Sequence, residues 1–294
     1  MTTRDLTYRL EALGLKIALG FFGLMPLDRA SCLGGWLGRH IGPLIGGVTK
    51  RARRNMARAM PELDPAQIDR LITGMWDNLG RTIAEYAHLD EFGSDAGQGR
   101  FEIVNLEGIR RARPEGQGAI IVSGHLANWE LLPLPLRQAG IFNAVIYRAA
   151  NNPYVNDWMV ALRERAITPI QIPKGASGAR QIVRTLKQGG VVAMLVDQKL
   201  NDGIEARFFG LKAMTTDAPA SIALRMGLPV IPASIERLKG SRFRMTVHTP
   251  IVPDPDAPRD AEIARVTQAI NDFLESHIRA HPAQWLWMHN RWPD

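Results

Sequence analysis

The sequence predicts an α/β domain with a mostly parallel central sheet flanked by helices, preceded by an N-terminal membrane-associated helical segment. Beyond residue 99, short apolar runs rich in β-branched residues alternate with helical patterns, which is typical of a parallel sheet. Before residue 60, an apolar stretch followed by a basic cluster predicts the membrane segment. We therefore divide the chain into an N-terminal anchor over residues 1–60 and an α/β domain over residues 61–294.

Composition limits the classes of protein to consider. The chain has 294 residues, of which 46% are hydrophobic, so it can bury a sizeable core. Its single cysteine, Cys32, excludes an internal disulfide framework and favours the cytoplasmic side. The net charge of +7 indicates an anionic partner: nucleic acid, phospholipid headgroups, a phosphorylated substrate or an acidic carrier protein.

The N-terminal segment begins with an apolar stretch over residues 13–27, continues through a glycine-rich apolar stretch over 32–48, and ends in a basic cluster over 50–58. Lys16 and Pro26 leave the first stretch short of the roughly 20 apolar residues of a spanning helix. Because the basic cluster follows the apolar residues, a cleavable signal is disfavoured. We expect a retained anchor lying in or dipping through the bilayer, with its arginines on anionic headgroups. The alternative is an amphipathic helix packed on its own domain.

The α/β part begins with a helix over residues 63–89, where Pro65 fits the first turn and apolar residues recur every three or four positions. The apolar runs that follow predict strands over residues 119–123, 144–147, 191–196, 230–235 and 245–247. Helical patterns lie between them, for example over residues 156–165 and 179–188. Strands and helices in this order predict the largely parallel sheet.

Polar residues directly follow four of these strands. They are His125, Arg148, Asp197 with Gln198, and Glu236. Ligands of open α/β sheets bind beyond the carboxyl ends of the strands. A histidine, an arginine and two carboxylates on this rim predict an active site there.

His125 and Glu130 are the predicted reactive pair. A histidine followed five residues later by an acid also occurs at His289 and Asp294, so this spacing alone is weak evidence for a reactive pair. Residues five apart on one helix lie about 140° apart, so His125 must precede the helix, with Glu130 in its first turn and Asn128 as a cap. Glu130 could then accept a hydrogen bond from one ring nitrogen and leave the other to take a proton.

No obvious serine or cysteine nucleophile lies beside this pair in the sequence. That favours direct attack by an acceptor hydroxyl on an acyl donor. The alternative interpretation of the same residues is a capping His125 and a solvated Glu130.

At these residues the sequence resembles the lipid A late acyltransferases, the lauroyl and myristoyl transferases of lipopolysaccharide synthesis within the lysophospholipid acyltransferase superfamily. The resemblance rests on linked motifs over nearly the whole chain: Ser123-Gly-His-Leu-Ala-Asn-Trp-Glu130, Tyr147-Arg148 with Asn151-Asn-Pro-Tyr154, Asp197-Gln198, Phe208-Phe209-Gly210 with Thr215-Thr216, Pro229-Val-Ile-Pro232 and Gln284-Trp-Leu-Trp-Met-His-Asn-Arg-Trp292. It implies a glycerol-3-phosphate acyltransferase-like fold. It also implies an enzyme on the cytoplasmic face of the inner membrane that transfers a fatty acyl chain from acyl carrier protein to a hydroxyl of a lipid A precursor.

The resemblance implies roles for four residues of the predicted rim. His125 would be the general base and Glu130 its orienting partner. Arg148 would stabilise the oxyanion or bind a phosphate of the acceptor, or else form a surface salt bridge. Asp197 would hold Arg148 or bind the acceptor, or else serve as a structural carboxylate at a strand end.

Three further residues are candidates for substrate binding. Lys174, in a glycine-containing loop before a helix, would meet a phosphate, the alternative being an ordinary loop. Phe208 and Phe209 would line the acyl channel, the alternative being simple core packing. No cofactor or metal is implied, and the donor is acyl carrier protein or coenzyme A.

The acceptor remains open between several membrane lipids. The glycerol-phosphate branch of the superfamily has an aspartate in the first motif and a Glu-Gly-Thr-Arg loop, whereas this chain has Glu130 and no such loop. A lysophospholipid acceptor is therefore less favoured than lipid A, and ornithine lipids and phosphatidylinositol mannosides stay as alternatives.

Two other functional classes also deserve comparison. A nucleic-acid binder using residues 50–58 is disfavoured, because the cluster adjoins an apolar segment and lacks stacking aromatics. A non-catalytic membrane scaffold is disfavoured by the intact set of His125, Glu130 and Arg148.

Overall fold

The computed structural model describes residues 3–94, 97, 99–113 and 116–293. Its centre is a seven-stranded sheet in the order β1-β9-β8-β2-β5-β3-β4, parallel except between β8 and β9. The bounds are β1 Phe101–Val104, β2 Ala119–Ser123, β3 Asn143–Tyr147, β4 Ile170–Pro173, β5 Val191–Leu195, β8 Val230–Arg237 and β9 Phe243–Val247. A hairpin of β6 (Ile204–Phe208) and β7 (Leu211–Thr215) stands apart from the sheet. The predicted α/β class is confirmed.

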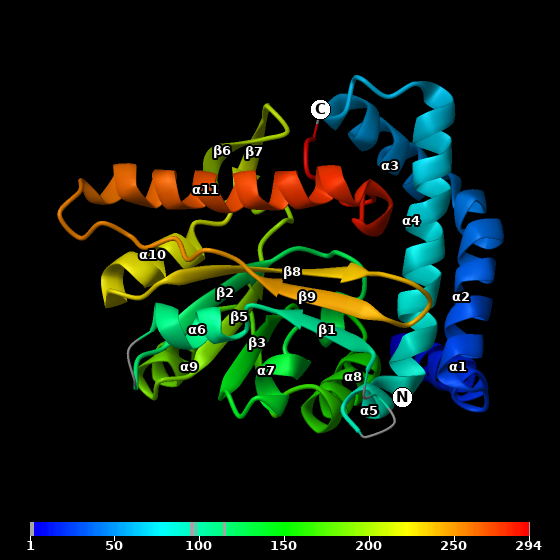
Figure 1. Ribbon diagram of the computed structural model, residues 1–294. Coiled ribbons are helices and arrows are strands. Elements are labelled where there is room, and N and C mark those ends of the chain that lie inside the picture. Colours follow the sequence, from blue (N-terminus) through cyan, green and yellow to red (C-terminus); the bar gives the residue numbers. More distant parts are fainter. Residues whose placement is uncertain (1–2, 95–96, 98, 114–115, 294) are drawn as a thin grey trace.

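Helices cover both faces of the sheet. One face carries α9 (Ala176–Lys187), α10 (Ala218–Met226) and α11 (Arg259–Ala280), and α11 runs lengthwise beside β8 (Figure 1). The other face packs against α5 (Leu89–Phe92), α6 (Glu107–Ala112), α7 (Leu134–Gln138) and α8 (Pro153–Ala166). Every residue of β2 is buried, and alternate side chains enter the two cores. Burial on both faces explains why the strand is a continuous apolar run.

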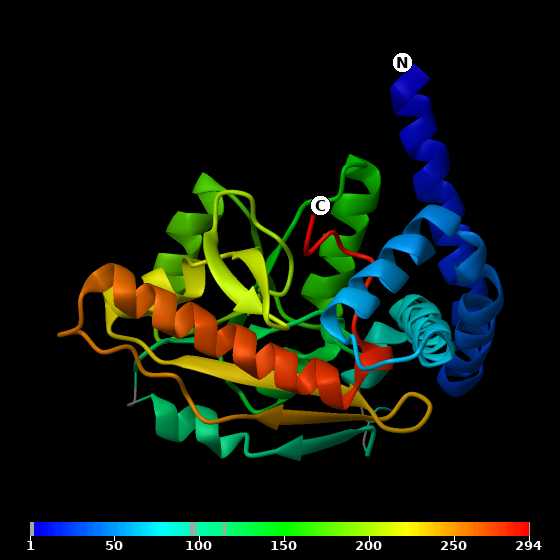
Figure 2. The same cartoon turned by 90° about the horizontal axis from the view of Figure 1, so that it is seen from above.

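The N-terminal helices form a group at one end of the sheet (Figure 1). They are α1 (Thr3–Gly23), α2 (Leu27–Ile41), the short 3₁₀ helix η1 (Gly42–Leu44), α3 (Gly46–Ala59) and α4 (Pro65–Glu85). The free end of α1 projects away from the rest of the molecule (Figure 2). Within the described part of the chain, none of the helices combines the length and apolar character needed to cross a membrane.

The helix predicted over residues 63–89 is α4 followed by a 3₁₀ turn and α5. Asp64 and Gln67 form a reciprocal capping box, and Pro65 occupies the first turn. Helix α2 approaches α4 so closely that a Cβ on Gly38 would lie 2.0 Å from the carbonyl oxygen of Trp76. This close packing requires glycine on α2 and makes α2 and α4 a single structural unit.

The basic helix α3 packs against the body of the protein, with Met56 in the same core as the sheet. We expected its arginines to face headgroups, but three of them contact the C-terminal segment, among them Arg54, which donates to the side-chain oxygen of Asn290 at 3.4 Å. Arg51 donates to the carbonyl of Met288 at 3.5 Å, and Arg58 donates to the carbonyl of Trp292 at 3.1 Å. Part of the basic cluster therefore serves to hold the C-terminus.

Candidate active site

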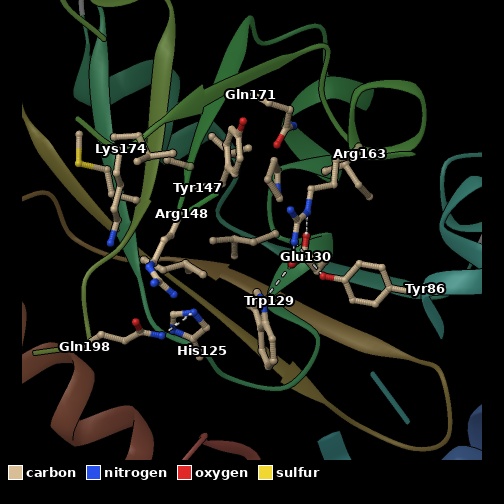
Figure 3. Close-up of a pocket in the computed structure, with 18 of the residues that line it drawn as sticks. Tyr86, His125, Trp129, Glu130, Tyr147, Arg148, Arg163, Gln171, Lys174 and Gln198 are labelled. Atoms are coloured by element: carbon tan, nitrogen blue, oxygen red, sulfur yellow. Dashed lines mark hydrogen bonds and ion pairs between the residues drawn. The ribbon is translucent and has the colours of Figure 1, made fainter. Parts of the chain in front are cut away.

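A pocket of about 440 Å³ opens at the carboxyl ends of the strands. The parallel strands β2, β3, β4 and β5 bring the loops that follow them to one edge of the sheet. The pocket is lined by residues from those loops and from neighbouring helices, among them Tyr86, His125, Trp129, Glu130, Tyr147, Arg148, Arg163, Gln171, Lys174 and Gln198 (Figure 3). His289, near the C-terminus, also lines it. Glu236, also expected on this rim, instead pairs with Arg244 and His281.

The imidazole of His125 is held by Asp197. The Nδ1 atom of His125 lies 2.7 Å from one carboxylate oxygen of Asp197, and the backbone N–H of His125 donates to the other at 2.8 Å. The indole of Trp285 also donates to that second oxygen, at 2.7 Å. Because the carboxylate accepts at Nδ1, the proton of neutral His125 sits there and Nε2 carries the basic lone pair. Such a nitrogen can take a proton from a hydroxyl.

Sheet register explains why His125 and Asp197 meet. Ser123 at the end of β2 pairs with Leu195 at the end of β5. His125 and Asp197 each lie two positions beyond these paired residues and are therefore neighbours. Gly124 leaves room for the carboxylate, since a Cβ there would lie 3.2 Å from Asp197 Oδ2. Adjacent strand ends of a parallel sheet thus place base and carboxylate together.

The charge of Asp197 is stabilised although its side chain is fully buried. Burial alone would raise the pKa of this carboxyl, but the electrostatic interaction and hydrogen bonds with His125, together with the hydrogen bond of Trp285, lower it below its usual value. Asp197 is therefore ionised at neutral pH. It faces His125 and not Arg148, which corrects the expectation that it would hold that arginine.

The loop after His125 contains a residue in a strained conformation. Ala127 has a φ of 48°, in the left-handed region that residues with a Cβ rarely adopt. Its N–H donates to the carbonyl of Gln284 at 2.9 Å, and its carbonyl accepts from Asn78 and Thr82. The C-terminal segment and α4 therefore fix the path of the loop that carries His125.

Glu130 occupies the pocket but does not orient His125, which corrects the predicted pairing. Its two carboxylate oxygens accept from Arg163 on α8, at 2.6 and 2.7 Å. The indole of Trp129 donates to Glu130 at 3.1 Å, and its ring contacts the His125 ring at a centroid distance of 5.2 Å (Figure 3). Residues 129–131 form a 3₁₀ turn instead of the first turn of a longer helix, and the expected cap Asn128 donates to Glu85 on α4.

The pair of Glu130 and Arg163 is largely enclosed, with side-chain exposures of 10% and 17%. Burial would raise the pKa of Glu130, but the Arg163 guanidinium lowers it below its usual value. Burial would likewise lower the pKa of Arg163, yet the Glu130 carboxylate raises it. Tyr86 accepts from Arg163 at 3.0 Å, and burial raises its pKa well above the ordinary value. Both members of the ion pair are therefore charged in the folded protein.

Arg148 and Lys174 form the basic side of the pocket, away from Glu130 (Figure 3). They follow the neighbouring strands β3 and β4, and both are exposed. Arg148 donates to Asn151 at 3.4 Å. Two exposed cations at the edge of this cavity can meet an anionic group of a ligand.

Phe208 and Phe209 do not line this pocket, which corrects the expectation that they form an acyl channel. Both are buried, at 0% and 5% exposure. Phe208 stacks on Trp292 and contacts Trp285 edge-on, and Phe209 packs against Trp287. The tryptophan-rich C-terminus and the β6–β7 hairpin thus share one aromatic core.

Two pocket residues were missed from the sequence. Arg163 lies within a helix of mixed composition, and nothing in its neighbourhood marks it as a partner of Glu130. The spacing between His289 and Asp294 gives no reason to place His289 in the site, and Asp294 lies outside the described residues. The signal that could have found His289 is its place among the C-terminal tryptophans, which already stood out as a motif.

Comparison with known proteins identifies the family of this chain. The model of the bacterial lipid A biosynthesis acyltransferase family matches residues 3–294. A phosphatidylinositol mannoside acyltransferase of Mycobacterium tuberculosis is 24% identical over 87% of this chain and 79% of its own. The lipid A biosynthesis palmitoleoyltransferase of Escherichia coli is 24% identical and the lauroyltransferase 25% identical, each over 87% of this chain and 83% of its own.

Among solved structures, the 1-acyl-sn-glycerophosphate acyltransferase of Thermotoga maritima aligns with 88% of this chain and 99% of its own. The TM-score is 0.40 and the sequence identity 17%. Since the family model spans nearly all of the sequence, the chain belongs to the bacterial lipid A biosynthesis acyltransferase family and is an acyltransferase.

Proposed function

We propose that this acyltransferase moves a fatty acyl chain from a thioester donor, acyl carrier protein in preference to coenzyme A, to a hydroxyl of a lipid A precursor. The observation that carries the chemistry is the hydrogen bond between His125 Nδ1 and the buried Asp197, which leaves His125 Nε2 as a base inside the pocket. Family membership and the Escherichia coli relatives support the acceptor.

The reaction needs one proton shuttle and no enzyme-bound acyl group. His125 Nε2 takes the proton of the acceptor hydroxyl as its oxygen attacks the thioester carbonyl. The tetrahedral intermediate collapses, the carbon–sulfur bond breaks, and the leaving thiolate takes the proton back from His125. The products are an ester and a thiol, and the base is regenerated.

The charged residues of the pocket have separate roles in this proposal. Arg148 and Lys174 bind a phosphate of the acceptor, and Arg148 is the nearer to His125 for stabilising negative charge on the reacting carbonyl oxygen (Figure 3). Glu130 acts through Arg163, whose guanidinium it keeps charged and fixed at the pocket wall. Asp197 orients the base.

Binding at the membrane is proposed through α1. Its exposed apolar side chains recur every three or four residues and form one face of the helix: Leu6, Leu10, Leu13, Ile17 and Phe21. An apolar face on a helix that projects from the body fits insertion into the headgroup boundary of a bilayer (Figure 2). We place the protein on the cytoplasmic face of the inner membrane, with α1 lying in the interface.

The membrane contact can be tested with Leu13→Glu combined with Ile17→Glu, whose parent side chains are 54% and 64% exposed. We expect less of the double variant than of the wild type to sediment with vesicles of anionic phospholipid. Its far-UV circular dichroism should be unchanged, which would show that the fold is intact. Val252→Glu is the matched control, because Val252 is 66% exposed and lies far from α1 in the sequence. Equal binding of the double variant and the control would contradict the assignment.

A phosphatidylinositol mannoside acceptor is the second candidate, because the mycobacterial relative is as similar as the palmitoleoyltransferase. Mass spectrometry of lipid A and of total polar lipids should compare cells that lack the protein with cells that regain it. We expect one acyl chain to be missing from lipid A and then restored by the wild type but not by His125→Ala. Unchanged lipid A with another lipid altered would favour a different acceptor.

A further inference from the structure

The proton-accepting nitrogen of His125 already has a partner in this structure. Nε2 of Gln198 lies 3.2 Å from Nε2 of His125 and 3.0 Å from Nε2 of His289. An amide nitrogen only donates hydrogen bonds, so both ring nitrogens accept here. The two amide hydrogens of Gln198 are therefore shared between the two imidazoles.

His289 is held firmly in this position although it lies near the C-terminus. Asn55 on α3 donates to the carbonyl of His289 at 2.5 Å and to that of Trp287 at 2.8 Å. Two residues further on, the buried Arg291 donates to the carbonyl of Met214 at 2.6 Å. The ring centroids of His125 and His289 are 5.3 Å apart.

The ionisation of His289 suits an accepting role. Burial, together with the nearby His125 and Arg51, lowers its pKa to about 4. The charged groups that face the His125–Gln198–His289 arrangement are Asp197 beyond β5, Arg51 on α3 and Arg148 beyond β3. His289 is consequently neutral at physiological pH, and its Nε2 can accept from Gln198.

We propose that Gln198 and His289 are positioning residues of the acyl-transfer site, an inference that rests on the function proposed above. While the acceptor is absent, Gln198 donates to Nε2 of His125 and stabilises the neutral ring. When the acceptor hydroxyl takes that place on His125, His289 keeps the amide of Gln198 and holds it beside the reacting group.

The contact between Gln198 and His125 should influence the pH range in which the enzyme is active. A protonated His125 would direct its Nε2–H at the amide N–H of Gln198, so this contact favours the neutral, active ring. Removing the amide makes protonation easier. The acidic limb of the pH profile of kcat/KM, which reports the free enzyme, should then move to higher pH by about 0.5–1 unit.

The experiment measures that profile for variants of Gln198 and His289. Gln198→Leu should move the acidic limb upward, and Gln198→Glu should move it further, because a carboxylate stabilises the protonated ring. His289→Phe should move it in the same direction by a smaller amount, and His289→Gln, which keeps an acceptor at similar reach, should restore the wild-type limb. His281→Phe is the control, since that histidine pairs with Glu236 outside the pocket.

Where a variant turns over too slowly, titration of the His125 ring protons by NMR gives the same midpoint. An unchanged acidic limb and an unchanged midpoint in Gln198→Leu would overturn the inference. A lower melting temperature in His289→Phe with an unmoved limb would do the same, because it would show a structural role only. The proposed function has a separate test: acyl transfer by His125→Ala at the wild-type rate would contradict it.

Discussion

Replacing Asp197 by asparagine separates its role as orienting carboxylate from its role in packing. The second carboxylate oxygen accepts from two donors, the backbone N–H of His125 and the indole of Trp285. An asparagine must keep its oxygen there, because an amide N–H₂ facing two donors would leave buried groups unpaired at about 1–3 kcal/mol each. Its amide nitrogen then faces Nδ1 of His125.

That arrangement imposes the wrong tautomer on the base. Nδ1 of His125 must accept from the amide, so the ring proton moves to Nε2, and Nε2 can no longer take a proton from the acceptor. The same substitution in a serine-protease triad lowers kcat by about 10⁴-fold, and we expect a similar loss here. In activation free energy this is about 5.5 kcal/mol.

The assay is kcat for acyl transfer at saturating donor, with Glu130→Gln measured in parallel. Thermal unfolding provides the control for folding, since asparagine preserves the volume and the polar contacts of the site. We expect Asp197→Asn to lose far more activity than Glu130→Gln. A folded Asp197→Asn variant that keeps more than a tenth of wild-type kcat would refute the assignment of Asp197 as the orienting residue.

Three further predictions concern stability and substrate binding. Glu130→Ala should lower the free energy of unfolding by about 3–5 kcal/mol in urea titrations, because it leaves the enclosed Arg163 unpaired, and leucine at both positions should recover much of the loss. Phe209→Ala should lower the free energy of unfolding by about 3–5 kcal/mol, because it leaves a cavity in the core, and should leave the preferred acyl-chain length unchanged. A changed preference for chain length at unchanged stability would instead place Phe209 in the acyl channel. Lys174→Ala should raise KM for a phosphorylated acceptor several-fold at low salt and less at high salt, and an equal effect at both would argue against a charge contact.

The sheet and its functional edge could be predicted because they depend on local pattern. The run from Ala119 to Ser123 is buried on both faces, which is why it reads as an uninterrupted apolar strand. The residues that follow the strands, His125, Arg148 and Gln198, do meet in one pocket. Parallel pairing brings these strand ends together, whereas Glu236 lies within the longer strand β8 and not beyond its end.

The partners of individual side chains could not be predicted because they depend on tertiary contacts. Glu130 is held by Arg163, 33 residues away on another helix, and Asp197 reaches His125 across 72 residues. A strand-end carboxylate looks the same in a sequence whichever neighbour it faces. The sequence therefore identified the loops of the site and assigned the orienting role to the wrong acid.

The surroundings of the aromatic residues likewise depend on tertiary contacts. Phe208 and Phe209 contact tryptophans near the C-terminus, and the hairpin that carries them was not expected. Whether an aromatic pair lines a cavity or fills a core is decided by packing that the local sequence does not contain.

The most direct test of the central claim, that His125 is the general base of acyl transfer, is the turnover of purified His125→Ala. The assay follows transfer of a labelled acyl chain from the thioester donor to the lipid acceptor in vesicles of defined composition. We predict that the variant folds and binds the vesicles like the wild type, while kcat falls by about 10²–10⁴-fold. Turnover close to that of the wild type in a folded, vesicle-bound variant would contradict the claim.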